Sequence, residues 1–159
     1  MNRFVFVFCL ICLPALAGAD GTADFVSLAK ADRELVLWRQ GQPIKRYEVA
    51  LGFAPTGDKQ QQGDGRTPEG RYVIDWRNEQ SRFHLSLHIS YPDKADKADA
   101  AERGVDPGGD IFIHGQPRAS GWLMRLPYDW TEGCIAVSNA EIEEIWTLVP
   151  NGTPIEITP

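Results

Sequence analysis

The chain has 159 residues, and 16 lysines and arginines against 22 aspartates and glutamates give it a formal net charge of −6 at pH 7. This length suits one domain and is short for two. An acidic chain offers no positive surface for nucleic acid or for anionic lipid, so neither is expected as a partner.

The first nineteen residues are typical of a secretory signal peptide. Arg3 supplies a positive charge, the run Phe4–Leu13 is apolar, and small residues with an A-x-A cleavage pattern follow. The apolar run is too short for a permanent membrane span. We therefore expect residues 1–19 to be removed and residues 20–159 to form a periplasmic or otherwise exported domain without a stable membrane anchor. An uncleaved N-terminal anchor is the alternative.

Strand patterns dominate the first half of the mature region. Short apolar or alternating segments bounded by turn residues are typical of β-strands. In the last predicted strand of this half, the odd-numbered residues from Phe83 to Ile89 are all apolar. The predicted strands are 25–28, 34–39, 44–51, 71–76 and 83–89, with a turn at 40–42 and a long loop rich in Gly, Gln and Asp at 52–68.

The second half contains the predicted helices. Residues 93–103 are Ala-rich and charged, which indicates an exposed helix or an ordered loop. A short buried strand, 111–113, comes next and ends on His114. Ser138 and Glu141 match a capping box, which predicts a helix to about residue 149, before a last strand at 153–158. The fold class expected from these elements is a single, mainly β domain with one or two helices.

Cysteine usage directs attention to one residue. Cys9 and Cys12 would leave with the signal peptide, so the mature chain keeps only Cys134. Thiols outside the cytoplasm are normally paired or absent. A lone cysteine there is an inert buried residue, an intermolecular disulfide or a reactive nucleophile.

The neighbours of Cys134 favour the nucleophile. Cysteine catalysis needs a thiolate, a base beside it and donors for the oxyanion. His114 ends an apolar strand, where a rigid scaffold displays functional groups, although a core histidine bonded to backbone is the alternative. Gly133 permits a strained backbone and close approach of a substrate, and N–H groups around it could face the oxyanion.

These residues resemble the catalytic signature of the L,D-transpeptidase (YkuD-like) family. That signature is a His, a variable loop and then Ser/Thr-His-Gly-Cys, matched here by His114, Thr131 and Gly133-Cys134. The segment GRTPEGRY at 65–72 is similar to the family's (K/R)-T-P-x-G-x-(F/Y) segment. The resemblance covers about residues 24–158. The sequence around Cys134 resembles that of the branch of YafK-like murein enzymes.

The resemblance implies a YkuD-like β-sandwich or barrel-like domain that acts on peptidoglycan stem peptides. Cys134 would attack the carbonyl at the L-centre of a diamino acid and expel a D-amino acid, and an amine or water would resolve the thioester. His114 would accept the thiol proton and then protonate the leaving amine. The Gly115 carbonyl would orient the imidazole, and Gly133 would contribute to the oxyanion hole. No metal or organic cofactor is implied.

Two departures from the family pattern bear on the substrate. Glu132 stands where the family usually has a second His, and Ala136 stands where Arg or Asn is usual. Either another group holds a substrate carboxylate, for which Arg118 and Arg125 in the catalytic loop are the candidates, or the substrate differs. The YafK-like branch also includes hydrolases that cut protein–peptidoglycan links, so hydrolysis, with a peptidoglycan-linked protein as partner, is the alternative to transfer.

The remaining candidates are less specific. His88 lies on the strand face opposite Leu87 and Ile89 and is a candidate for substrate binding, as is Thr131 of the signature. Two rival functions stay open: a zinc peptidase that uses His84, His88 and His114, and a non-enzymatic envelope-binding module. Aromatic residues of the catalytic loop would line the cleft or fix the loop by packing: Trp122, Tyr128 and Trp130.

Overall fold

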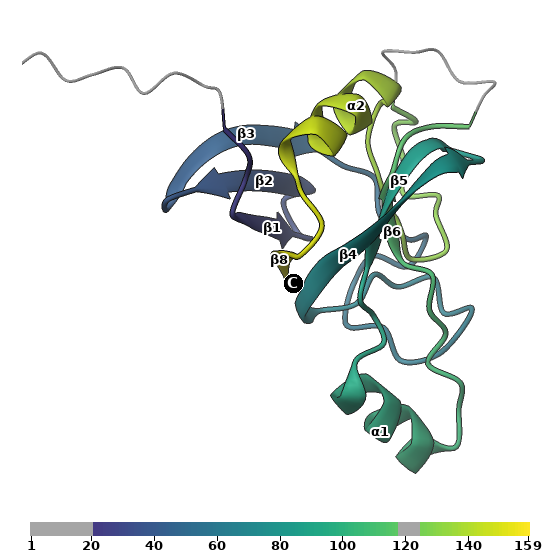
Figure 1. Cartoon of the computed structure of the whole chain (residues 1–159). Helices are drawn as coiled ribbons and strands as arrows, with labels where there is room; N and C mark the ends of the chain where they lie inside the picture. Colours follow the sequence, from purple (N-terminus) through teal and green to yellow (C-terminus); the bar gives the residue numbers. More distant parts are fainter. Residues whose placement is uncertain (1–20, 118–124) are drawn as a thin grey trace, which may run out of the picture.

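The structure, a computed structural model, describes residues 21–117 and 125–159. Within these residues the chain forms one curled eight-stranded sheet and two helices, which confirms a mainly β domain (Figure 1). The strand order in the sheet is β3-β2-β1-β8-β4-β5-β6-β7. The elements are β1 Phe25–Ala29, β2 Glu34–Arg39, β3 Gln42–Glu48, β4 Gly70–Ser81, β5 His84–Ile89, α1 Lys94–Arg103, β6 Phe112–His114, β7 Ile135–Ala136, α2 Asn139–Leu148 and β8 Thr153–Thr158.

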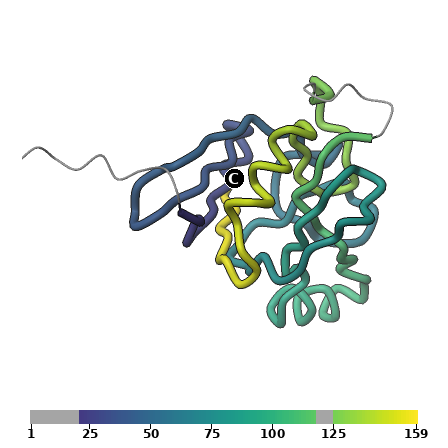
Figure 2. The backbone as a smooth tube through the Cα atoms, turned by 45° about the horizontal axis from the view of Figure 1, so that its top comes forward, coloured from purple at the N-terminus to yellow at the C-terminus, as the bar shows by residue number. Residues whose placement is uncertain are grey.

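The last strand joins the two halves of the sheet. β8 pairs in parallel with β1 and antiparallel with β4, so Ile155 lies between Val26 and Tyr72. Figure 2 shows the result: the yellow C-terminal segment runs between the purple-blue N-terminal strands and the teal hairpin of β4 and β5. The apolar side chains of both halves therefore meet in one core.

α2 closes this core and follows the sequence prediction. The Ser138 hydroxyl accepts from the Glu141 N–H, and the Glu141 carboxylate accepts from the Ser138 N–H at 2.8 Å, which is the predicted capping box. Ile142 and Ile145 are fully buried on the helix face toward the sheet. The capped end of α2 lies directly after β7, so the helix also fixes the end of the segment that carries Cys134.

α1 resolves an open alternative, because residues 94–103 are a helix and not an irregular loop. Asp93 caps its first turn, and Gly104 ends it in the left-handed region at φ 67°. Ala100 is its buried residue, so the predicted exposure is confirmed. The helix projects from the end of the domain away from α2 (Figure 1).

Three strands differ from the prediction. β4 continues to Ser81, where the sequence suggested an end at residue 76, because residues 77–81 pair with β5 in a long hairpin. β3 ends at Glu48, and the chain after it leaves the hairpin to form bridges from Ala50 and Gly52 to the segment around Cys134. The two-residue strand β7 was not predicted. The first difference depends on pairing within a hairpin, and the other two depend on pairing with segments far away in the sequence.

No helix among the described residues is long and apolar enough to cross a membrane. The predicted signal peptide, residues 1–19, lies outside the described residues.

Candidate active site

His114 ends β6, and Cys134 directly precedes the neighbouring strand β7 at the end of the sheet. β6 and β7 pair in parallel with Ile113 opposite Ile135, which places Cys134 beside Phe112 and two residues along from His114. Residues two apart on a strand share a face, so both side chains lie on the same side of the sheet. They line one cleft of about 1040 Å³.

The imidazole of His114 is fixed through its backbone neighbour. Nδ1 lies 2.7 Å from the Gly115 carbonyl oxygen, and because a carbonyl only accepts, Nδ1 carries the proton. In the neutral ring Nε2 is then the free acceptor. Gly115 has no room for a side chain, since a Cβ there would lie 2.5 Å from Asn139 Oδ1 and 2.8 Å from the Phe83 carbonyl oxygen.

Aromatic rings keep water from this imidazole. His114 is 3% exposed, with Phe83 stacked on it at 4.6 Å between centroids and Trp130 at 5.7 Å. Burial lowers the pKa of His114 to about 4, and the hydrogen bond to the Gly115 carbonyl opposes this only in part. The ring is therefore neutral at pH 7 and can accept a proton.

The Cys134 thiol is also neutral. Burial raises its pKa to about 11, aided by the charges of Asp110 and Glu132 and opposed by the Phe112 N–H and by Lys59. Sγ lies 3.5 Å from the Asp110 carbonyl oxygen. Burial is the largest of these effects on the thiol pKa. The resting pair is thus a thiol and a neutral imidazole, and the proton must leave as Sγ attacks.

Thr131 shapes the turn that carries the nucleophile. Its hydroxyl donates to the Cys134 carbonyl oxygen at 2.7 Å and accepts from the Gly133 N–H at 3.2 Å. Gly133 has φ 125°, and a Cβ there would lie 2.6 Å from the Arg66 carbonyl oxygen. The Gly133 N–H is thus already hydrogen-bonded, and its predicted oxyanion role would require this bond to be exchanged. Thr131 also lines the cleft.

The segment after β3 holds this turn from the other side. Ala50 and Ala136 exchange two backbone hydrogen bonds of 2.9 and 2.8 Å. Thr131 donates its N–H to Leu51 and accepts from the Phe53 N–H. Residues 50–53 therefore act as a backbone brace for the catalytic turn, a role that nothing in their sequence indicated.

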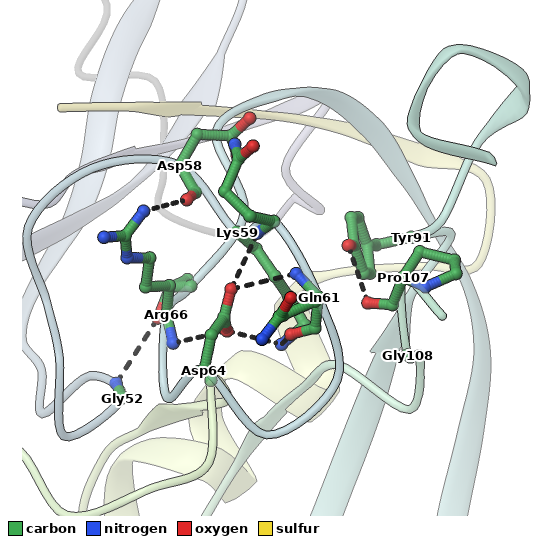
Figure 3. Close-up of polar contacts among 12 residues, drawn as sticks. Gly52, Asp58, Lys59, Gln61, Asp64, Arg66, Tyr91, Pro107 and Gly108 are labelled. Carbon is green, nitrogen blue, oxygen red and sulfur yellow. Dashed lines mark hydrogen bonds and ion pairs between the residues drawn. The ribbon is translucent and has the colours of Figure 1, made fainter. Parts of the chain in front are cut away.

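The loop at 57–69 forms one wall of the cleft and is itself held by charge. Asp64 accepts from the backbone N–H groups of Gln60, Gln61 and Arg66 and from Lys59 Nζ at 2.9 Å (Figure 3). Although burial alone would raise the pKa of Asp64, these hydrogen bonds and the lysine hold it below its usual value. Lys59 lines the cleft.

A second buried lysine fastens this wall to the sheet. Lys30 Nζ donates to the carbonyl oxygens of Gly57 and Thr67 and to Glu69 Oε1, at 2.6, 2.9 and 2.8 Å. The segment at 65–72 that resembles the family motif therefore has a structural role, because it places the Arg66 backbone against Gly133.

Two predicted substrate-binding residues lie away from the cleft lining. His88 Nδ1 is 2.6 Å from Asp75 Oδ1, and its ring stacks on Trp76 at 5.0 Å. Arg125 pairs with Glu48 and donates to the Leu126 carbonyl oxygen. Arg118 and Trp122 lie outside the described residues. Two other cations, Lys59 and Arg82, line the cleft, and neither was singled out from the sequence.

Gln116 is a further residue that the sequence reasoning missed. It is fully buried, donates from Nε2 to the Val137 carbonyl oxygen at 2.6 Å and accepts from the Leu126 N–H. Its own N–H donates to Asn139 Oδ1. Gln116 thus ties the loop after His114 to the segment after Cys134. The one feature of the sequence that could have indicated a role for Gln116 is its position directly after His114 and Gly115.

The three histidines have separate partners in the structure. His84 contacts Glu143, His88 contacts Asp75, and His114 contacts the Gly115 carbonyl. Among residues 21–117 and 125–159 there is no group of three or more His, Cys, Asp or Glu side chains that could hold a metal ion.

A curled β-sheet in which a histidine at the end of one strand and a cysteine just before the next line one cleft defines the class of β-rich Cys–His domains. The family model described as YkuD, L,D-transpeptidase catalytic domain, matches residues 24–157, and the chain belongs to this family. The family predicted from the sequence is thereby confirmed.

Individual relatives agree with this assignment. YafK of Escherichia coli (strain K12), whose name assigns it provisionally to the L,D-transpeptidases, is 29% identical over 136 residues, covering 81% of this chain and 48% of that protein. The crystal structure of the helical cell shape determining protein Pgp2 from Campylobacter jejuni has 26% identity and a TM-score of 0.64, covering 87% of this chain and 48% of that one. An L,D-transpeptidase from Xylanimonas cellulosilytica DSM 15894, 18% identical with a TM-score of 0.56 over 87% of this chain and 61% of that one, shares the fold. The chain thus spans about half the length of the YafK and Pgp2 relatives.

Proposed function

We propose that this chain is a cysteine-dependent L,D-transpeptidase that acts on peptidoglycan stem peptides through a thioester acyl-enzyme. The observation that carries the proposal is the fixed tautomer of His114. With Nδ1–H bound to the Gly115 carbonyl, the basic Nε2 remains available in the same cleft as Cys134 Sγ. Membership of the YkuD family supports the reaction class and the substrate class.

The proposed acylation starts from two neutral groups. As Cys134 Sγ attacks the carbonyl carbon of the donor peptide, its proton passes to His114 Nε2. The tetrahedral intermediate collapses, the C–N bond breaks, and the imidazolium returns the proton to the leaving amine. A low pKa of the imidazole suits the second step, because a weakly basic His114 releases its proton readily.

The second half of the reaction repeats the same proton transfers. An acceptor amine gives up a proton to His114 and attacks the thioester carbonyl, and the thiol of Cys134 is restored when the C–S bond breaks. If water takes the place of the amine, the product is a shortened peptide, which is the hydrolytic variant of the same site. Attack on a bond that links a protein to peptidoglycan would use identical steps.

The cellular setting is part of the proposal. The signal-like first nineteen residues support export to the periplasm or cell envelope, where peptidoglycan lies. There the enzyme would act in cell-wall biogenesis or remodelling, with effects on cell shape, and it would need no cofactor.

The test is product analysis by mass spectrometry. Wild-type protein is incubated with a stem tetrapeptide, with and without a D-amino acid acceptor, and the intact protein is weighed for a covalent acyl adduct. We expect an adduct that is absent in Cys134→Ala and turnover at least about a hundredfold lower in His114→Gln. Arg71→Gln, on the exposed face of β4 and paired with Glu156, is the control and should match wild type. Full turnover in Cys134→Ala, or none in the wild type with any peptidoglycan donor, would overturn the proposal.

A further inference from the structure

The proposed reaction sets a requirement for charge near His114. When the donor ends in a D-amino acid, its leaving nitrogen is protonated by the imidazole, and its α-carboxylate lies one carbon from that nitrogen. Ala136, two residues after Cys134, has no hydrogen-bond donor in its side chain. A carboxylate brought into this cleft therefore needs a cation from another element.

The described part of the cleft lining contains two cations with different surroundings. Lys59 is buried, and its ammonium group is held by Asp64 and by the Gln61 carbonyl, so its charge is already compensated. Arg82, at the tip of the β4–β5 hairpin, is exposed, and no described residue forms an ion pair with it. Arg82 is thus the cation whose charge remains available to a ligand.

Arg82 also lies on the correct side of the cleft. Its Cζ is 5.7 Å from the centroid of the Phe83 ring, and that ring stacks on the His114 imidazole. A single aromatic ring therefore connects the guanidinium with the base. The acidic residues of the lining belong to other segments: Asp106, Asp110 and Glu132. Repulsion from these carboxylates would direct an anionic end of the substrate toward the hairpin tip.

We propose that Arg82 binds the α-carboxylate of the D-amino acid that leaves the donor peptide. An arginine suits this task, because its planar fork donates two parallel hydrogen bonds to a carboxylate. The inference rests on the proposed function and specifies its substrate: peptides with a free carboxyl terminus are favoured over those in which that carboxyl is amidated or linked onward. It assigns to Arg82 the carboxylate-binding role for which Arg118 and Arg125 were the candidates from the sequence.

The experiment compares one stem tetrapeptide ending in D-alanine with its C-terminal carboxamide. The readout is the ratio of kcat/KM for the acid to kcat/KM for the amide. In the wild type the ratio should exceed one by about tenfold or more, as expected for a charge-assisted hydrogen bond. Arg82→Gln should bring the ratio close to one, and Arg82→Lys should restore it in part. Arg71→Gln removes a charge of the same kind outside the cleft and should keep the wild-type ratio.

Binding gives a second readout that does not depend on turnover. In a Cys134→Ala background, calorimetry should show that Arg82→Gln weakens binding of the acid by about the same factor and makes acid and amide equivalent. If Arg82→Gln lowers activity on acid and amide equally, the residue acts only by holding Phe83 over His114, and the carboxylate role is overturned. A wild type that uses acid and amide equally also overturns it while leaving the acyl transfer intact. A wild type that processes neither peptide, nor any other peptidoglycan donor, overturns the proposed function as well.

Discussion

Replacing Lys30 with methionine tests whether one buried ammonium group holds the 57–69 wall of the cleft. The lysine side chain is 2% exposed and donates to the Gly57 and Thr67 carbonyls and to the Glu69 carboxylate. Methionine keeps most of the unbranched apolar stem and removes all three donors. The substitution therefore isolates the polar contribution from the packing contribution.

The expected loss follows from these three contacts. Removing one partner of a buried pair costs about 3–5 kcal/mol when the remaining charge cannot reach water. Glu69 is 20% exposed, so water partly replaces the lysine there. The two carbonyls lose a charged donor, and each such hydrogen bond contributes about 1.5–3 kcal/mol. We therefore expect the free energy of unfolding to fall by about 3 kcal/mol, which for a domain of this size lowers Tm by about 6–12 °C.

The measurement is urea and thermal unfolding followed by circular dichroism. Lys45→Met is the matched control, because Lys45 also pairs with a glutamate, Glu144, but is 44% exposed; it should cost less than about 1 kcal/mol. Since the wall carries Lys59 and touches the turn of Cys134, Lys30→Met should also lower turnover below the new Tm. A loss of less than about 1 kcal/mol for Lys30→Met would show that the wall is held by other contacts, and the reasoning would be refuted.

Three further outcomes are expected at the catalytic pair. Because burial raises the pKa of Cys134 to about 11, alkylation by iodoacetamide should be slow at pH 7 and accelerate toward pH 11; a rate that is already maximal at pH 7 would contradict a neutral resting thiol. The pKa of His114 is lowered from 6.5 to about 4, so kcat/KM should stay constant as the pH falls below 6.5 and decline only near pH 4, where the base becomes protonated. A decline of kcat/KM near pH 6.5 would instead indicate a solvated imidazole. Gly115→Ala should lower kcat by about tenfold or more while leaving the protein folded, since the added Cβ displaces the carbonyl that orients His114, and unchanged kcat would show that this carbonyl is not needed.

The sequence predicted the features that depend on local patterns. The capping box of Ser138 and Glu141 marks the start of α2, and alternating apolar residues mark β5. His114 and Cys134 were singled out because each lies beside a glycine in a short signature. Such signals involve neighbours along the chain, so a single sequence carries them.

The missed features depend on contacts between distant segments. The brace at 50–53 consists of backbone hydrogen bonds, which leave no trace in residue identity. Ser86 occupies a position that alternation assigns to an open face, yet it is buried, pairs with His114 across the sheet and lines the cleft. Nothing in the sequence distinguishes Arg82 from other surface arginines, because its place in the cleft lining depends on the fold of the β4–β5 hairpin. The sequence also did not show that His88 pairs with Asp75, 13 residues away, or that Arg125 pairs with Glu48, 77 residues away.

The central position of β8 has a consequence for the order in which the domain can assemble. Residues 153–158 fill the gap between β1 and β4, strands that are separated by some forty residues and have no other direct partner in common. Before β8 is in place, the two halves of the sheet are separate ribbons with unpaired edges, and the core between them is open. Long-range pairing of this kind slows folding, since chain entropy must be lost before the contacts form. The core between the two halves is therefore completed late in folding, by a strand that contributes no side chain to the cleft.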